Sequence, residues 1–265
     1  MSVFAMSNTA HCDADTHFGA AARFAIYYAP GAASPWWQAG CAWLQRDPSG
    51  PVPPPAPTVP GLSRSLADLN SEPRRYGWHA TLVAPFHCKP GIDSHAVLAL
   101  ATDWASRQHG FMLSPRVALL ERFVAIQIAK PGAADPAGEA TGEAAMRSLA
   151  ASAVRSFAPL RAAPSDLALA KRRKMPLSAR QEALMLEWGY PFVFDEYRFH
   201  LTLSNSIDAA DAQLMLAWWE QRIAALGPLP VDGVAIYVEP QAGDDFRLWQ
   251  RLPFGTTLRS IEKDC

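Results

Sequence analysis

The sequence lacks the marks of several large protein classes. Its formal net charge is −1 over 265 residues, whereas a broad, sequence-independent surface for nucleic acid needs a basic excess. It contains no G-x-x-x-x-G-K-[ST] stretch, which is the phosphate-binding loop of many kinases. Its 4 cysteines are scattered, with neither a C-x-x-C pair nor zinc spacing, which is typical of reduced thiols. A small anionic ligand stays open, because such a site needs only a few local cations.

Long apolar segments are also missing. The N-terminus has no basic region followed by an apolar run, and the uncharged stretch between Arg23 and Arg46 is interrupted by PGAASP. We therefore expect no signal peptide, no membrane span and a cytoplasmic protein. Lysine is scarce, because arginine supplies 19 of the 24 basic residues. A GC-rich coding sequence would give the same bias.

Local patterns predict an α+β protein. Residues 1–22 are small and polar without periodicity, so we expect a disordered tail there and a second tail at 256–265. Between them we expect a single bilobal domain, 23–255, whose two pseudo-symmetric halves exchange near 120–140. The proline-rich stretch 47–61 is expected to be an extended loop. The predicted helices lie at 34–46, 63–69, 93–108, 141–157, 165–174, 178–188 and 208–225, and the predicted strands at 23–30, 76–85, 111–121, 122–130, 190–204, 231–239 and 245–252.

One short phrase occurs twice in the chain. YGWHATL at 76–82 and YRFHLTL at 197–203 both place a histidine two residues before a threonine. In a strand, alternation puts the aromatic and aliphatic residues of each phrase on one face and the histidine and threonine on the other. The order of predicted elements around the phrases also repeats, which indicates an internal duplication. Two such strands side by side would display two histidines and two threonines in one cleft.

That set of side chains suits phosphoryl chemistry. An in-line displacement at phosphorus needs a proton removed from the attacking oxygen and a proton given to the leaving oxygen. His79 and His200 titrate near neutral pH, so one can be neutral while the other is charged. The hydroxyls of Thr81 and Thr202 can donate to the non-bridging phosphate oxygens. No metal or other cofactor is required by this scheme.

The phrases and their surroundings resemble one known superfamily. The stretches are RRYGWHATLVAPF, RQEALMLEWGYPFVFDEYRFHLTLS and the opening RFAIYYAPGAASPWWQAGCAWLQRDP. They are similar to the two-histidine (2H) phosphoesterase superfamily, and to its phosphonate-metabolism branch found beside carbon–phosphorus lyase genes. The likeness covers roughly residues 23–255. It implies a bilobal, internally duplicated fold with two antiparallel sheets facing a central cleft and helices outside, and cyclic phosphodiesterase chemistry.

The resemblance places the catalytic pairs at His79 with Thr81 and at His200 with Thr202. One position departs from the branch, in which a lysine usually follows HATL, because Val83 stands there in this chain. Regular alternation would put Val83 on the same face as His79. We therefore expect the cleft to lack one phosphate-facing cation.

Other residues near the phrases are weaker candidates for the site. Arg198, two residues before the second histidine, would face the cleft as a fixed cation or form a salt bridge, and Gly77 at the matching position would leave room for a ligand. Tyr76 and Tyr197 are candidates for substrate contact, although their apolar face favours core packing. The basic run KRRK at 171–174 follows a predicted helix and is expected to be a solvated end rather than part of a lid.

The sequence thus predicts a metal-independent phosphoesterase that hydrolyses a cyclic phosphodiester, either a 2′,3′-cyclic nucleotide or a cyclic ribose phosphate of phosphonate catabolism. Two alternatives stay open, namely an RNA-end processing 2H enzyme (a ligase or 3′-end phosphodiesterase) and a non-catalytic module that binds a phosphorylated ligand. We expect a monomer with a small phosphorylated substrate and neither a nucleic-acid nor a membrane partner. The pseudo-symmetry leaves open which histidine is the acid.

Overall fold

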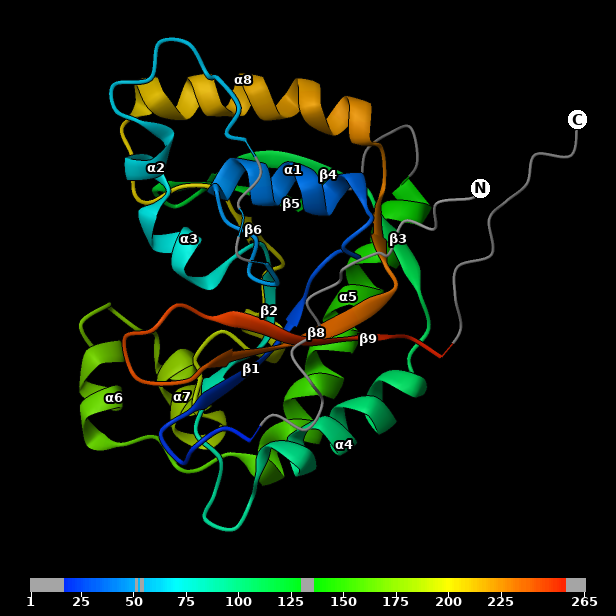
Figure 1. Ribbon diagram of the computed structural model, residues 1–265, viewed down its shortest axis with the longest axis vertical. Coiled ribbons are helices and arrows are strands. Elements are labelled where there is room, and N and C mark those ends of the chain that lie inside the picture. Colours follow the sequence, from blue (N-terminus) through cyan, green and yellow to red (C-terminus); the bar gives the residue numbers. More distant parts are fainter. Residues whose placement is uncertain (1–16, 51, 53–54, 130–135, 256–265) are drawn as a thin grey trace, which may run out of the picture.

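Two larger antiparallel sheets, a two-stranded sheet and the covering helices make up the fold (Figure 1). The computed structural model describes residues 17–50, 52, 55–129 and 136–255. The strands of the two larger sheets are β1 (Arg23–Tyr28), β2 (Ala80–Phe86), β4 (Pro115–Leu120), β5 (Phe123–Ile128), β6 (Leu201–Thr202), β8 (Gly233–Glu239) and β9 (Arg247–Pro253), and the short strands β3 (Phe111–Leu113) and β7 (Leu229–Val231) pair with each other. The helices are α1 (Pro35–Leu44), α2 (Leu66–Leu69), α3 (Ser71–Tyr76), α4 (Ser94–Ser106), α5 (Pro136–Phe157), α6 (Asp166–Arg172), α7 (Ala179–Trp188) and α8 (Ala209–Leu226), with 3₁₀ turns at Ala158–Leu160 and Phe194–Glu196.

The chain passes from one sheet to the other after each repeated phrase. One sheet has four strands in the order β2-β1-β8-β9, and the other has three in the order β4-β5-β6. Each phrase leads into an edge strand, because β2 and β6 lie at the borders of their sheets. After β2 the chain runs through α4 to β4 in the three-stranded sheet, and after β6 it runs through α8 to β8 in the four-stranded sheet.

The helices cover the outer faces of the sheets. Helix α8 packs on β4 and β5, while α4 packs on β8 and β9 and α5 packs on β2. Figure 1 shows α8 and α4 at opposite ends of the molecule, with the strands between them. The buried apolar residues of both sheets join in one cluster that includes many tryptophans, among them Trp36, Trp43 and Trp219. No helix in the described part of the chain is long and apolar enough to cross a membrane.

Local signals in the sequence explain where several elements begin. Ser34 caps α1, because its hydroxyl accepts from the backbone N–H of Trp36, and Pro35 occupies the first helical position. Asp93 caps α4 in the same way through the N–H of Ala96. The strands β4 and β5 are joined by a tight turn where the predicted strands 111–121 and 122–130 meet, and Glu121 within it has a positive φ of 56°. The remaining predicted helices also form, with ends that differ by a few residues.

The predicted strand at 190–204 is wrong for most of its length. Only Leu201–Thr202 pairs, with β5, while a 3₁₀ turn occupies Phe194–Glu196. The aromatic side chains of this segment are used for packing, since the Phe194 ring lies edge-on to Trp188 at 4.9 Å. Both catalytic candidates therefore lie just before their strands, and Tyr76, expected in a strand, is the last residue of α3.

The N-terminal tail predicted at 1–22 lies partly within the described residues. Its residues 1–16, like the predicted tail at 256–265, lie outside the described residues. Phe18 packs edge-to-face against Phe24 and Trp249 at 5.8 and 5.2 Å between ring centroids, and Ala22 is buried. The last residues of the predicted tail thus cover the four-stranded sheet.

Gly40 is expected to be the glycine of α1 that cannot be replaced. A Cβ atom at this position would lie 2.1 Å from the indole of Trp78, which is fully buried. Gly40→Ala should lower the free energy of unfolding by about 1–3 kcal/mol through overpacking. Urea unfolding would measure the loss, with Gly50→Ala as the control, because a Cβ there meets nothing closer than 3.8 Å. Equal stability of the two variants would contradict this packing.

Candidate active site

The backbone before His79 is fixed by the core. Gly77 ends α3 with a φ of 78°, and its N–H donates to the carbonyls of Pro73 and Arg74. The next side chain, Trp78, is buried and stacks on Trp219 with 11° between the ring planes. The predicted alternation is confirmed from the residue before each histidine onward, since the apolar residues at −1, +1 and +3 are buried while the histidines and threonines are partly exposed.

Both histidines make the same hydrogen bond to the chain. The Nδ1 atom of His79 lies 2.9 Å from the carbonyl oxygen of Gly77, and that of His200 lies 2.8 Å from the carbonyl oxygen of Arg198. A carbonyl oxygen only accepts, so Nδ1 carries the hydrogen in each ring. The Nε2 atom is therefore the free nitrogen at both positions, able to accept a proton when the ring is neutral.

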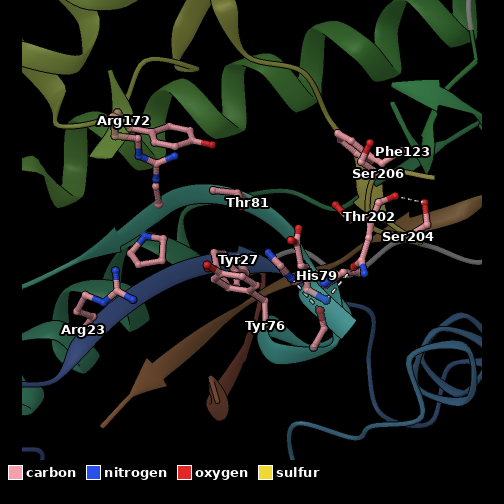
Figure 2. A pocket seen from close by; sticks show the side chains of 17 residues that line it. Arg23, Tyr27, Tyr76, His79, Thr81, Phe123, Arg172, Thr202, Ser204 and Ser206 are labelled. Atoms are coloured by element: carbon pink, nitrogen blue, oxygen red, sulfur yellow. Dashed lines mark hydrogen bonds between the residues drawn. The ribbon is translucent and has the colours of Figure 1, made fainter. Parts of the chain in front are cut away.

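The two histidines line adjoining hollows of one cleft. The first hollow has a volume of about 320 Å³ and is lined by His79, Thr81 and Thr202, among others (Figure 2). The second, of about 280 Å³, is lined by Thr81 and His200. Four residues belong to both hollows, namely Thr81, Phe123, Arg172 and Tyr190. The structure therefore brings the two predicted His/Thr pairs to one place from strands far apart in the sequence.

The two rings differ in their surroundings. His79 stacks on the ring of Tyr27 with 3.9 Å between centroids (Figure 2). Burial lowers the pKa of His79 to about 4, the bond to Gly77 acts in the opposite direction, and the nearby charge of His200 lowers the pKa further. Burial also lowers the pKa of His200, and so does the nearby charge of Arg198, whereas the bond to the Arg198 carbonyl and the charge of Glu121 act in the opposite direction. The neutral form of His79 is thus favoured in the free protein.

The predicted substrate-contact residues divide between the cleft and the core. Arg198 lines the second hollow beside His200. Tyr76 lines the first hollow, with its ring stacked on Phe246 at 5.0 Å. Tyr197 borders the second hollow but is only 6% exposed. Within the described residues its buried hydroxyl has no hydrogen-bond partner.

The expected position of Val83 in the cleft is wrong. Tyr27 pairs with Thr81 and Ile26 pairs with Val83, so β2 carries one extra residue, Leu82, between these pairs. Such a bulge reverses the alternation of the strand beyond it. Val83 is accordingly 1% exposed in the core, while Ala84 lines the first hollow. The cleft therefore loses no cation through the valine, because position 83 does not face it.

The expected role of Gly77 also needs correction. Gly77 does line the first hollow, but a Cβ atom at this position would meet the ring of Pro48 at 2.8 Å. Its φ of 78° also disfavours other residues. The glycine is required by the end of α3 and the contact with Pro48, rather than by the space for a ligand.

The sequence interpretation missed the cations that other elements bring to the cleft. Arg172 lies in the KRRK run that was expected to be solvated, yet it lines both hollows. The prediction holds for its neighbour Arg173, which pairs with Glu182 at 2.6 Å. Arg23 lines the first hollow and bonds Glu239, which is fully buried. The basic run was the only sequence signal for a role of Arg172 in the cleft, because strand alternation does not predict where a helix such as α6 packs.

Neutral polar residues missed by the sequence interpretation follow Thr202. Ser204, Asn205 and Ser206 line the first hollow. Asn205 fixes the corner between α2 and α3, because its amide donates to the carbonyl of Asp68 and accepts from the N–H of Glu72. In the described part of the chain, no group of three or more His, Cys, Asp or Glu side chains is placed to hold a metal ion.

Comparison with known proteins identifies the family. Residues 81–247 match the family described as "Protein of unknown function (DUF1045)". The chain belongs to this family. Two curated relatives are similar to nearly all of it. One is a protein of Janthinobacterium sp. (strain Marseille), 39% identical over 88% of this chain, and the other is a protein of Laribacter hongkongensis (strain HLHK9), 36% identical over 90%.

Both relatives of this DUF1045 chain carry the name ribose 1,5-bisphosphate phosphokinase PhnN. The chain spans about half the length of these curated relatives, since the matches cover 51% and 54% of them. The other half of each relative has no counterpart in the match.

A titration of the two imidazoles would test the geometry of the site directly. We expect ¹⁵N NMR spectra to show the Nδ1–H form in both rings, because each Nδ1 donates to a carbonyl. The His79 ring should stay neutral until the pH falls to about 4. His79→Gln would assign the signal by removing it. Protonation of this ring near its ordinary pKa of 6.5 would contradict the burial described here.

Proposed function

We propose that this protein is a metal-independent phosphoesterase that hydrolyses a cyclic phosphodiester. The observation that supports this most directly is the pair of imidazoles, His79 and His200, which have the same hydrogen-bonded Nδ1 and border one cleft. Two such rings provide both proton transfers of an in-line displacement. The adjoining hydroxyls of Thr81 and Thr202 are suited to donate to the phosphate oxygens between the rings.

The duplicated, bilobal 2H phosphoesterase fold is part of this proposal. Each His/Thr phrase leads into an edge strand, β2 or β6, that pairs with the strand β1 or β5. A long helix follows each phrase strand, after which the chain joins the other sheet. This repeated course supports two equivalent halves that exchange strands.

The different environments of the two rings support different roles for them in the proton transfers. His79 has the strongly lowered pKa, so its neutral Nε2 is the base that takes a proton from the attacking water. His200, whose pKa is also lowered by burial but is raised by the hydrogen bond to the Arg198 carbonyl and by Glu121, takes the role of the acid that gives a proton to the leaving oxygen. One P–O bond to water forms while one P–O bond of the ring breaks. The proton gained by His79 and the proton lost by His200 balance the step.

The names of the relatives point to the substrate. The chain lacks a P-loop, so we infer that the kinase activity in those names belongs to the half that this chain does not match. Consider a cyclic phosphate that bridges the C1 and C2 hydroxyls of ribose 5-phosphate. Hydrolysis of its P–O bond to the C2 oxygen would give ribose 1,5-bisphosphate. That product is the compound named in the relatives as the kinase substrate. The proposed reaction, a step of phosphonate breakdown, would therefore supply the kinase.

Hydrolysis assays in the presence of a chelator test this function. The wild-type protein should open cyclic ribose phosphates or 2′,3′-cyclic nucleotides, and either His79→Ala or His200→Ala should reduce kcat/KM about 10²–10⁴-fold through loss of a proton transfer. His95→Gln is the control, because His95 lies in α4 and lines neither hollow. Activity that survives in both alanine variants would exclude the mechanism. Binding of the ligand without turnover would favour a non-catalytic module.

The pH profile tests the assignment of base and acid. Activity requires neutral His79 and protonated His200, so kcat/KM should fall below about pH 4 and again above the lowered pKa of His200, which lies below 6.5. The bound phosphate anion stabilises both imidazolium forms and should move the kcat profile to higher pH. In His200→Gln the alkaline decline should disappear from the residual rate. An alkaline decline that persists there would assign the acid elsewhere.

A further inference from the structure

We propose that Arg172 binds the non-bridging oxygens of the reacting phosphate, and that α6 thereby supplies the cation of the active site. The inference rests on the proposed function for the identity of the phosphate. Its structural basis is position, because Arg172 is the only charged residue among the four shared by both hollows. Thr81, one of the two phosphate-binding threonines, is shared as well. Figure 2 shows Arg172 beside the strand that carries Thr81.

The charge of Arg172 is left available by its surroundings. Within the described residues no carboxylate lies at ion-pair distance from it, whereas the adjacent Arg173 is paired with Glu182. The guanidinium lies over the ring of Tyr190, with its central carbon 4.7 Å from the centroid. Burial raises the pKa of Tyr190, so the phenol stays neutral and does not cancel the charge. Tyr190 also accepts a side-chain hydrogen bond from Arg172, so this residue orients the cation, and the other N–H donors of the guanidinium are available for an anion.

The remaining groups of the cleft cannot replace this cation. Both imidazoles have lowered pKa values, so they bring little positive charge to the free site. Arg23 is engaged by the buried carboxylate of Glu239. Arg198 lines the second hollow but not the first. A phosphate whose negative charge grows in the transition state would thus depend on Arg172 for compensation.

Helix α6 lies at the surface and carries Arg172 at the edge of the cleft. It begins at the cap Ser165 and ends at Arg172, and none of its residues is buried. Helix α7, which follows α6 in the chain, is tied to the turn before His200 by Arg180 with Asp195 at 2.9 Å. The guanidinium is therefore positioned from outside both sheets. A cation at the end of a helix is also favoured by the helix dipole.

Matched variants of neighbouring arginines test the proposal. Arg172→Ala, Arg172→Lys and Arg173→Ala would be compared with the wild type, using inorganic phosphate as a competitive inhibitor and two substrates, one with and one without a second phosphate group. Arg172→Ala should raise the inhibition constant for phosphate at least tenfold and lower kcat/KM for both substrates about 10²-fold. Arg172→Lys should recover part of both losses. Arg173→Ala should stay within about twofold of the wild type, because Arg173 lies outside the cleft.

Each outcome of this comparison decides the proposal. Equal effects of the two alanine substitutions, or phosphate inhibition that persists in Arg172→Ala, would overturn it. A loss of kcat/KM confined to the substrate with a second phosphate group would also overturn it, because Arg172 would then bind that second phosphate rather than the reacting one. If the wild type binds phosphate through Arg172 but opens no cyclic phosphodiester, the proposed function fails while the phosphate site stands. If only His79→Ala abolishes turnover, the function stands without Arg172.

Discussion

The candidate site depends on one hydrogen bond, from a histidine side chain to a backbone carbonyl, that is made twice. In each phrase the carbonyl two residues before the histidine accepts from its Nδ1 atom. The two carbonyls are turned in different ways, by a glycine with a positive φ that ends α3 and by an extended segment after a 3₁₀ turn. The result is the same at both positions, because the tautomer and the direction of the ring are fixed together. Everything proposed about proton transfer follows from the two Nε2 atoms left free.

The environments of the rings then break this symmetry. His79 is stacked against Tyr27 and its pKa is strongly lowered by burial, whereas His200 lies near the carboxylate of Glu121. A cyclic phosphodiester requires different roles of two similar groups, and a difference in desolvation is sufficient to separate them. In the proposed mechanism the duplicated phrase therefore supplies the two imidazoles, and the unequal packing around them is the basis for the roles of base and acid.

Apart from Arg198, the arginines that line the cleft come from elements outside the two phrases. Strand β2 contains no basic residue and so contributes no cation to the cleft. Its bulge also turns position 83 into the core. Arg172 reaches the cleft from α6, where the chain is otherwise exposed. The residues proposed to transfer protons therefore come from other elements than the residue proposed to bind the anion. The imidazoles lie at the starts of two edge strands, while the proposed anion contact is made by a helix at the rim.

The sequence by itself determined the features that are encoded locally. Ser34 and Pro35 predict the start of α1, the repeated phrase predicts the paired His79 and His200, and alternation predicts which of their neighbours are buried. These signals are local because capping and strand alternation involve residues only a few positions apart. Only the tertiary structure decided the bulge at Leu82, the two-residue length of β6 and the place of Arg172. A bulge depends on the register with a neighbouring strand, and the position of a rim helix depends on contacts between segments far apart in the chain.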